Sequence, residues 1–185
     1  MICSDPIETP RLRLRTLHAA DIGEAYFGWV HDPEILRFLE LRFTGVASIA
    51  ELVAFVESVN ASPNNLMLGI FRKSDDRHIG NIKLGPIVRE HARGEIGYLI
   101  GERSAWGQGY ASEAIRVVAH HGLERLDLVK VTSGCYDANV GSAKALLKAG
   151  FVHEATIPSH CVCEGRRVAS LLFGMDRRSA ANVPF

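Results

Sequence analysis

The sequence predicts an α/β (α+β) fold with a mixed, mostly antiparallel central sheet of about six to seven strands flanked by about four helices. Three strand-like segments follow one another between residues 66 and 100, which favours an antiparallel meander. Strand and helix patterns then alternate up to residue 173, which favours crossover connections. At 185 residues and 47% hydrophobic content, the chain predicts a single domain over 1–185, with its core at about 8–175.

Charge and composition narrow the function. The 21 basic and 21 acidic residues cancel, whereas a nucleic-acid-binding protein usually carries a basic excess. The first six residues lack a signal-peptide pattern, and no apolar run approaches membrane-spanning length. We therefore expect a cytoplasmic protein, a monomer or homodimer, that binds neither nucleic acid nor a membrane.

The four cysteines lack the C-x-x-C spacing of zinc sites, so we interpret them as reduced thiols with no metal. Cys161 and Cys163 lie two residues apart beside His160, which makes a metal site conceivable. A strand of alternating small residues is the favoured interpretation. Cys135 is interpreted as a small buried residue rather than a nucleophile.

The first half of the chain predicts one strand, two helices and three further strands. Leu12, Leu14 and Thr16 alternate with arginines, as in a half-buried strand. A capping box at 21–24 opens a helix to about Trp29. A second box, at 48–51, opens a helix that ends at 62–65 and whose apolar face comprises Leu52, Phe55, Val56 and Val59. Strands follow at 66–71, 78–84 and 95–100, with a hairpin loop at 73–76.

The second half alternates between helices and strands. A helix at about 111–123 turns Ala111, Ala114, Ile115, Val118 and Ala119 towards the core, and we place His120 and His121 on its surface. A strand is expected at 129–136. Asn139 caps the next helix, which carries Ala143, Leu146 and Leu147 and stops at Gly150. The last strands are expected from Phe151 onward and at 168–173, before a frayed tail at 177–185.

The most informative motif is Trp-Gly-Gln-Gly-Tyr-Ala at 106–111, between a strand and a helix. Two glycines and an alanine leave little side-chain bulk, so several backbone amides can point at one ligand. The positive end of the helix dipole lies at the same place and favours a phosphate or pyrophosphate. The motif lacks the third glycine and the leading strand–helix–strand unit of a Rossmann fingerprint, and it lacks the P-loop lysine.

Together, four ordered motifs resemble the GNAT acetyltransferase superfamily, and more closely its Rim-type branch, which includes ribosomal-protein N-terminal acetyltransferases. They are Ile96-Gly97-Tyr98, the 106–114 run, Asn139-x-x-Ser142, and Lys148-Ala149-Gly150-Phe151. The opening Thr9-x-Arg11-Leu12-x-Leu14-Arg15 is similar to that branch too. The resemblance spans about residues 8–175. It implies acetyl-CoA (coenzyme A) as co-substrate, with its pyrophosphate on the amides of residues 107–112.

Two departures from the family pattern matter. Position 108, often Lys or Arg in this branch, is Gln, which leaves the phosphates more dependent on backbone donors. Many members have Tyr at the place of Leu146 to protonate the departing thiolate, and Leu cannot do this. The branch often has Ser at the place of Ser142, proposed for the same task.

The resemblance implies the following site. Glu95 is the candidate base, with a solvated strand-end charge as the alternative, and Ser142 is the candidate acid, with a first-turn helix residue as the alternative. The cofactor-binding residues are Ile96, Gly97, Tyr98, Leu99, Ile100, Trp106, Gly107, Gln108, Gly109, Tyr110, Ala111, Ser112, Asn139 and Ser142. Apart from the resemblance, we predict Glu95, His91 and Tyr136 as substrate-binding residues, His91 because it lies in the loop before the Glu95 strand. We expect residues between about 21 and 63 to recognise the acceptor. Lys144 or Arg103 could reach the cofactor phosphates, but we favour a solvated surface position for both.

The resemblance therefore implies acetyl-CoA-dependent transfer of an acetyl group to a primary amine, on a protein N-terminus or a small molecule, by direct attack in a ternary complex. One alternative is acetylation of a nucleotide-linked amino sugar for surface polysaccharide or flagellin, because residues 79–87 look like acetyltransferases of those pathways. The other is a non-catalytic acyl-CoA-binding sensor domain, which the presence of both Glu95 and Ser142 disfavours.

Overall fold

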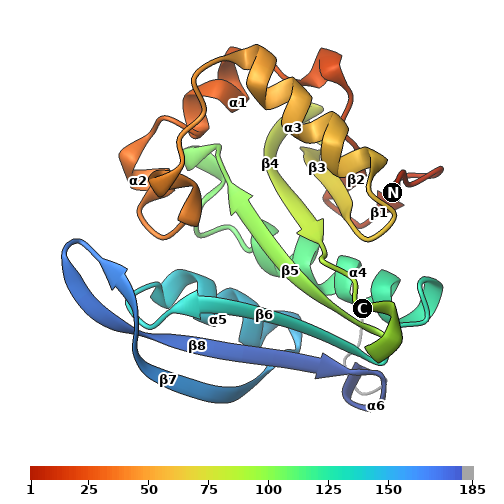
Figure 1. Cartoon of the computed structure of the whole chain (residues 1–185). Helices are drawn as coiled ribbons and strands as arrows, with labels where there is room; N and C mark the ends of the chain where they lie inside the picture. The colour runs from red at the N-terminus through yellow and green to blue at the C-terminus, as the bar shows by residue number, and fades with distance from the viewer. Residues whose placement is uncertain (181–185) are drawn as a thin grey trace.

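The computed structural model describes residues 1–180, and a single sheet organises them (Figure 1). The strands are β1 (Ile7–Glu8), β2 (Leu12–Thr16), β3 (Leu66–Arg72), β4 (Arg77–Leu84), β5 (Arg93–Ile100), β6 (Lys130–Tyr136), β7 (Val152–Cys163) and β8 (Arg166–Asp176). The helices are α1 (Glu24–Trp29), α2 (Pro33–Leu36), α3 (Ile49–Ala61), α4 (Tyr110–Arg125), α5 (Val140–Ala149) and α6 (Arg177–Ala180). Short 3-10 turns are η1 (Ala19–Asp21), η2 (Glu40–Phe43), η3 (Arg89–His91) and η4 (Arg103–Ala105). The predicted mixed, mostly antiparallel sheet is confirmed. It has eight strands in the described residues, whereas the sequence predicts about six to seven.

The strand order is β1-β2-β3-β4-β5-β6-β8-β7, and among the strands of residues 1–180 only the β5–β6 pair is parallel. That pair is short: its register runs from Arg93 opposite Lys130 to Glu95 opposite Thr132. Beyond it the two strands separate, and Figure 1 shows β5 and β6 spreading apart from a common end. The rest of β5 stays paired with β4 on its other edge. The sheet therefore opens in its middle.

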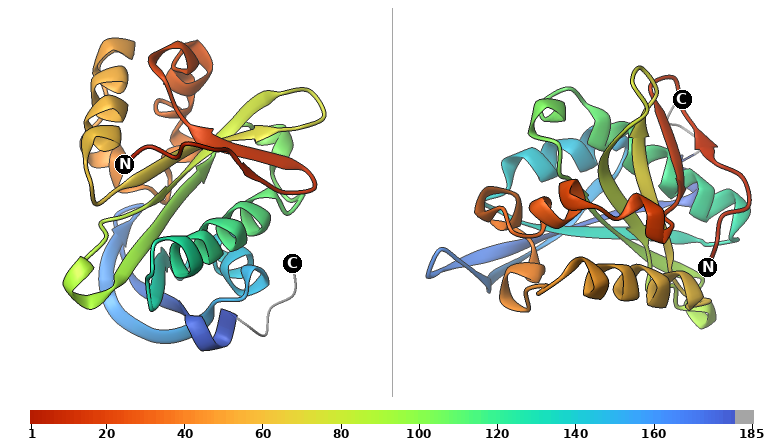
Figure 2. Two further views of the ribbon diagram at one scale, coloured as in Figure 1. Left: turned by 90° about the vertical axis from the view of Figure 1, so that its right-hand side faces the viewer. Right: turned by 90° about the horizontal axis from the view of Figure 1, so that it is seen from above.

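Helices cover both faces of the sheet, as Figure 2 shows for α3 and α4. Ile115 and Val118 of α4 pack in the larger core cluster with Ile82 and Ile96 of the sheet. On the other face, Leu52 and Val56 of α3 join Tyr26, Trp29 and Phe71. Burial of each large apolar side chain contributes about 1.5–3 kcal/mol, so these two clusters hold the opened sheet in place.

Several local predictions are confirmed by the helix ends. The Ser48 hydroxyl accepts from the Glu51 amide, and the Asn139 side chain accepts from the Ser142 amide. Gly150 ends α5 in the left-handed region, with φ of 102°. Cys161 and Cys163 lie in β7, as the strand interpretation requires. All four cysteines are free thiols.

The predicted capping box at 21–24 is wrong. Asp21 belongs to η1, and α1 begins at Glu24 with Gly23 as its N-cap and no side-chain cap. The Asp21 carboxylate instead forms an ion pair with Arg15 at 2.6 Å and accepts from the His18 amide. Arg15 donates to both carboxylate oxygens, and this pairing holds the pKa of Asp21 below its usual value.

The solvent exposure of several helix side chains differs from the prediction. Phe55 and Leu147 are half-exposed rather than buried, because only a narrow stripe of α3 and of α5 meets the sheet. His120 is buried on the core side of α4, where its Nδ1 contacts Glu124, and His121 is half-buried. Of the predicted frayed tail, Arg177–Ala180 forms α6, and residues 181–185 lie outside the described part of the chain. Within residues 1–180, no helix combines the length and apolarity needed to cross a membrane.

Candidate active site

The opening between β5 and β6 begins at a buried hydrogen bond. The Ser133 hydroxyl on β6 donates to the Ile96 carbonyl on β5 at 2.8 Å, one position beyond the last paired residues. Past this point, β5 presents to β6 a backbone edge that pairs with no described strand. Such an edge can hydrogen-bond an extended ligand as a further strand would.

The glycine turn leads from β5 into α4. The Trp106 indole N–H donates to the Ile100 carbonyl at 2.7 Å, which fixes the start of the turn. Gly107 and Gly109 have φ of 72° and 82°, in the left-handed region that favours glycine. Gly109 is the N-cap of α4, so the amides of the 16-residue helix's first turn face outward from its positive end.

Gln108 does not line the cavity at the opening. Its side-chain amide donates to the Ser104 carbonyl, and its own carbonyl accepts from Arg11 at 2.9 Å. Arg11 is fixed in turn by Glu113 of α4, with a 2.6 Å ion pair. Arg11, the residue before β2, therefore connects the N-terminal part of the chain to the glycine turn.

Two cations approach the turn from outside the glycine motif. A Cβ placed on Gly109 would lie 3.6 Å from Nη2 of Arg11 and 3.7 Å from Nζ of Lys148. Lys148 and Lys144, one helical turn apart on α5, both line the cavity, although their side chains are exposed. Arg103 does not line the cavity, and its guanidinium is paired with Asp32 at 2.6 Å and with Glu34. The sequence interpretation missed Lys148, whose signal was its i+4 spacing from Lys144.

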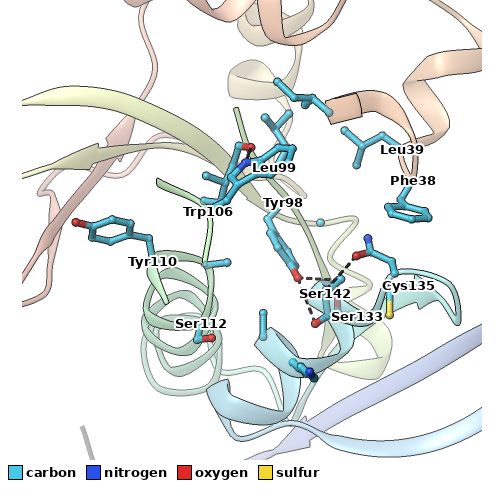
Figure 3. A pocket seen from close by; sticks show the side chains of 18 of the residues that line it. Phe38, Leu39, Tyr98, Leu99, Trp106, Tyr110, Ser112, Ser133, Cys135 and Ser142 are labelled. Carbon is cyan, nitrogen blue, oxygen red and sulfur yellow. Dashed lines mark hydrogen bonds between the residues drawn. The ribbon is translucent and has the colours of Figure 1, made fainter. Parts of the chain in front are cut away.

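The two hydroxyls of Tyr98 and Ser142 meet across the opening at 2.7 Å (Figure 3). Tyr98 extends from β5, and Ser142 lies in the first turn of α5, where Asn139 accepts from its amide at 3.1 Å. Burial raises the pKa of Tyr98 to about 12, and the hydrogen bond with Ser142 only partly offsets this. Cys135 lies beside them: burial raises the pKa of its thiol, and a hydrogen bond with Ser142 partly offsets this.

A cavity of about 660 Å³ joins these parts. Every residue predicted to bind the cofactor lines it except Gln108. At one end it is bounded by the glycine turn and α5, and at the other by the α2 region, from which Phe38 and Leu39 contribute side chains (Figure 3). The remaining lining residues are Glu34, Ile35, Arg37, Ala105, Ser133, Gly134, Cys135, Gly141, Lys144, Ala145 and Lys148.

The predicted base and substrate residues lie outside this lining. Glu95 is exposed on β5, one position before the wall begins at Ile96. His91 is exposed in η3. Tyr136 lies at the end of β6 in a second cavity of about 370 Å³, where its hydroxyl contacts Glu40 and accepts from Arg42. The three residues are thus not brought together in one group.

The architecture, an opened mixed sheet with a glycine turn and a helix N-terminus at the opening, is that of the N-acetyltransferase class of acyltransferases. Residues 11–152 match the family model described as the acetyltransferase (GNAT) domain. The chain therefore belongs to the GNAT acetyltransferase family.

Relatives and solved structures agree with this assignment. The chain is 27% identical over 178 residues to the uncharacterized N-acetyltransferase p20 of Bacillus licheniformis, covering 96% of this chain and 99% of that protein. It is 30% identical to the uncharacterized N-acetyltransferase YoaA of Bacillus subtilis, covering 86% and 89%. The fold resembles spermidine N-acetyltransferase from Vibrio cholerae, in complex with CoA and spermine, with a TM-score of 0.82, 18% identity, and coverage of 94% and 100%. It also resembles RimL, a ribosomal L7/L12 α-N-protein acetyltransferase in a disulfide complex with CoA, with a TM-score of 0.81, 18% identity, and coverage of 93% and 98%.

Proposed function

We propose that the chain transfers the acetyl group of acetyl-CoA to a primary amine by direct attack in a ternary complex. The acceptor is a small amine or a protein N-terminus, and the chain works as one catalytic domain in the cytoplasm. The observation that carries the proposal is the cavity that runs from the glycine turn, past the opening of the sheet, to the α2 region. Two substrates that enter from its two ends meet beside β5.

The glycine-turn end fits the phosphates of CoA. The first turn of α4 supplies amide donors, and Lys148 adds positive charge on the facing side. Arg11 acts as a brace, because its guanidinium is already engaged by Glu113 and the Gln108 carbonyl. Lys148 of α5 thus supplies the positive charge that Gln108 lacks.

The middle of the cavity fits the pantetheine arm and the thioester. The arm carries amides that can pair with the free backbone edge of β5 beyond Ile96. A Cβ on Gly97 would meet no atom within 4 Å, so open space lies where the reacting carbonyl would approach. A backbone amide near Gly97 would then stabilise the oxyanion.

The acid and the base act from opposite faces of β5. Successive residues of a strand face opposite sides, which puts Glu95 and Gly97 on one face and Tyr98 on the other. Ser142 meets Tyr98 on the second face and protonates the departing thiolate. Glu95, just outside the cavity wall, takes the proton of the amine through water.

The comparisons support an amine acceptor without choosing its size. One structural neighbour is a spermidine acetyltransferase and another acetylates a ribosomal protein N-terminus. The cavity volume of about 660 Å³ is in the range of small-molecule sites.

The test is a screen for amine-dependent thiol release from acetyl-CoA. The panel contains peptides, amino acids, polyamines, aminoglycosides and amino-sugar nucleotides, and calorimetry measures CoA binding in parallel. We expect at least one amine to raise thiol release above the amine-free rate. Clear CoA binding without release by any amine would instead identify a non-catalytic acyl-CoA sensor.

A further inference from the structure

We infer that Tyr98 is the proton source behind Ser142, so that the two hydroxyls deliver one proton to the departing CoA thiolate as a unit. This inference rests on the proposed function, since it concerns the acid step of that reaction. It assigns to Tyr98 more than a place in the cavity wall. It also accounts for how a serine hydroxyl can act as an acid here.

The geometry connects the two groups directly. The Tyr98 and Ser142 hydroxyl oxygens lie 2.7 Å apart, a short distance for a hydrogen bond between hydroxyls. Ser142 is held in place because its backbone amide donates to the side-chain oxygen of the helix cap Asn139. Both residues line the cavity, together with Cys135, so a thiolate beside Ser142 has Tyr98 directly behind the serine.

Acid strength explains why a second hydroxyl is needed. An aliphatic alcohol is a much weaker acid than a phenol, so Ser142 alone would leave an alkoxide in a buried site. Passing the charge on to Tyr98 leaves a phenolate, which is the more stable anion. The pKa of Tyr98, raised to about 12 by burial, keeps its proton in place until the thiolate forms.

A tyrosine at the place of Leu146, the acid in many members of the family, is missing from this chain. Leu146, one turn further along α5, is fully buried in the core cluster and carries no proton. The acid function therefore has to come from hydroxyls at the opening. Tyr98 and Ser142 are the pair of cavity-lining hydroxyls that the structure joins by a hydrogen bond within residues 1–180.

The protonated amine first gives one proton to Glu95, which passes it to solvent. The amine nitrogen then forms a bond to the thioester carbonyl carbon and loses its second proton to solvent. The tetrahedral intermediate collapses, the C–S bond breaks, and its electron pair goes to sulfur. The Ser142 proton moves to sulfur, and the Tyr98 proton moves to the Ser142 oxygen. Solvent returns a proton to the phenolate, so acetyl-CoA and a protonated amine give the amide, CoA thiol and one proton.

The test does not need the acceptor. The thiolate fraction of CoA bound to the full chain is measured by ultraviolet absorbance across pH, with wild type, Tyr98→Phe and Ser142→Ala. Hydroxyl donors to sulfur stabilise the thiolate, so each variant should lower the bound thiolate fraction near neutral pH about tenfold. The matched control is Tyr26→Phe, because burial also raises the pKa of Tyr26 to about 12 but Tyr26 lies outside the cavity lining.

The outcomes separate the two proposals. Calorimetry first gives the CoA concentration that saturates each variant, at which the thiolate fraction is then compared, and thermal melts establish folding. An unchanged thiolate fraction in Tyr98→Phe, with CoA bound, overturns the pair and leaves the acetyltransferase proposal standing. A wild-type chain that does not bind CoA overturns the proposed function and the pair with it. If the thiolate fraction falls equally in Tyr98→Phe and in Ser142→Ala, and falls no further when both changes are combined, the two hydroxyls act as one unit.

Discussion

Ser133 and Ile96 are joined by a buried 2.8 Å hydrogen bond at the point where β5 and β6 separate. The hydroxyl satisfies a carbonyl that loses its strand partner when the sheet opens. Ser133→Ala leaves that carbonyl without this donor, and we expect the free energy of unfolding to fall by about 1–3 kcal/mol. Denaturant unfolding measures this, with Ser74→Ala in the exposed hairpin loop as the control. Equal stability of the two variants would contradict the role given to Ser133.

Gly109 should be more sensitive than its neighbour Gln108. Gly109→Val forces a β-branched side chain into φ of 82°, while Gln108→Ala removes a side chain that points away from the cavity. We expect the first change to weaken CoA binding about tenfold or more, and the second by less than about threefold. Calorimetric titration with CoA compares the two. A larger loss in Gln108→Ala would refute an anchor built from backbone amides.

Lys148 should contribute a salt-dependent part of the affinity for CoA. Its ammonium approaches the glycine turn and can meet a phosphate there. We expect Lys148→Gln to weaken CoA binding by about three- to tenfold at low salt, with a smaller difference at high salt because ions screen the attraction. Lys73→Gln, in the β3–β4 loop, is the control. A salt-independent loss would indicate a packing effect rather than a charge effect.

Glu95→Gln tests the base. The amide is similar in size but cannot accept the proton of the amine, so we expect kcat to fall about 100-fold or more. The affinity for acetyl-CoA should stay within about twofold, because Glu95 lies outside the cavity lining. Steady-state kinetics with the best amine from the screen gives both values. Unchanged turnover would remove Glu95 from the mechanism.

His78 makes stability depend on pH. Its half-buried ring packs against Phe71 and Trp29, and desolvation lowers its pKa below the usual 6.5. The unfolded chain therefore binds a proton that the folded chain does not, between the unfolded pKa near 6.5 and the lower folded pKa. Stability is full above that window and falls as the pH drops through it. Melting temperatures at pH 5, 6 and 7.5 should show a slope that His78→Gln reduces and His91→Asn, at an exposed position, preserves.

Local features were predictable from the sequence, because neighbouring residues determine them. The glycine turn, the Ser48 and Asn139 caps and the Gly150 stop all depend on residues within a few positions of one another. The hydrophobic periods likewise indicated the order of strands and helices. This was enough to predict the mixed sheet and the position of the glycine turn between β5 and α4.

Relationships across the fold were not predictable in this way. Arg11 reaches the Gln108 carbonyl across 97 positions, and Tyr98 meets Ser142 across 44. No local pattern reports such contacts. Periodicity also overestimated burial at Phe55 and Leu147, because the width of the helix stripe that meets the sheet depends on how the helix packs.

We propose that the opening between β5 and β6 holds acetyl-CoA in one direction. A crystal structure of the chain with CoA tests it most directly. We predict the pyrophosphate within hydrogen-bond distance of the amides of 107–112, the pantetheine arm along the free edge of β5, and the sulfur beside Ser142 and Cys135. CoA bound outside this opening, or with its sulfur at the glycine turn, would contradict the account.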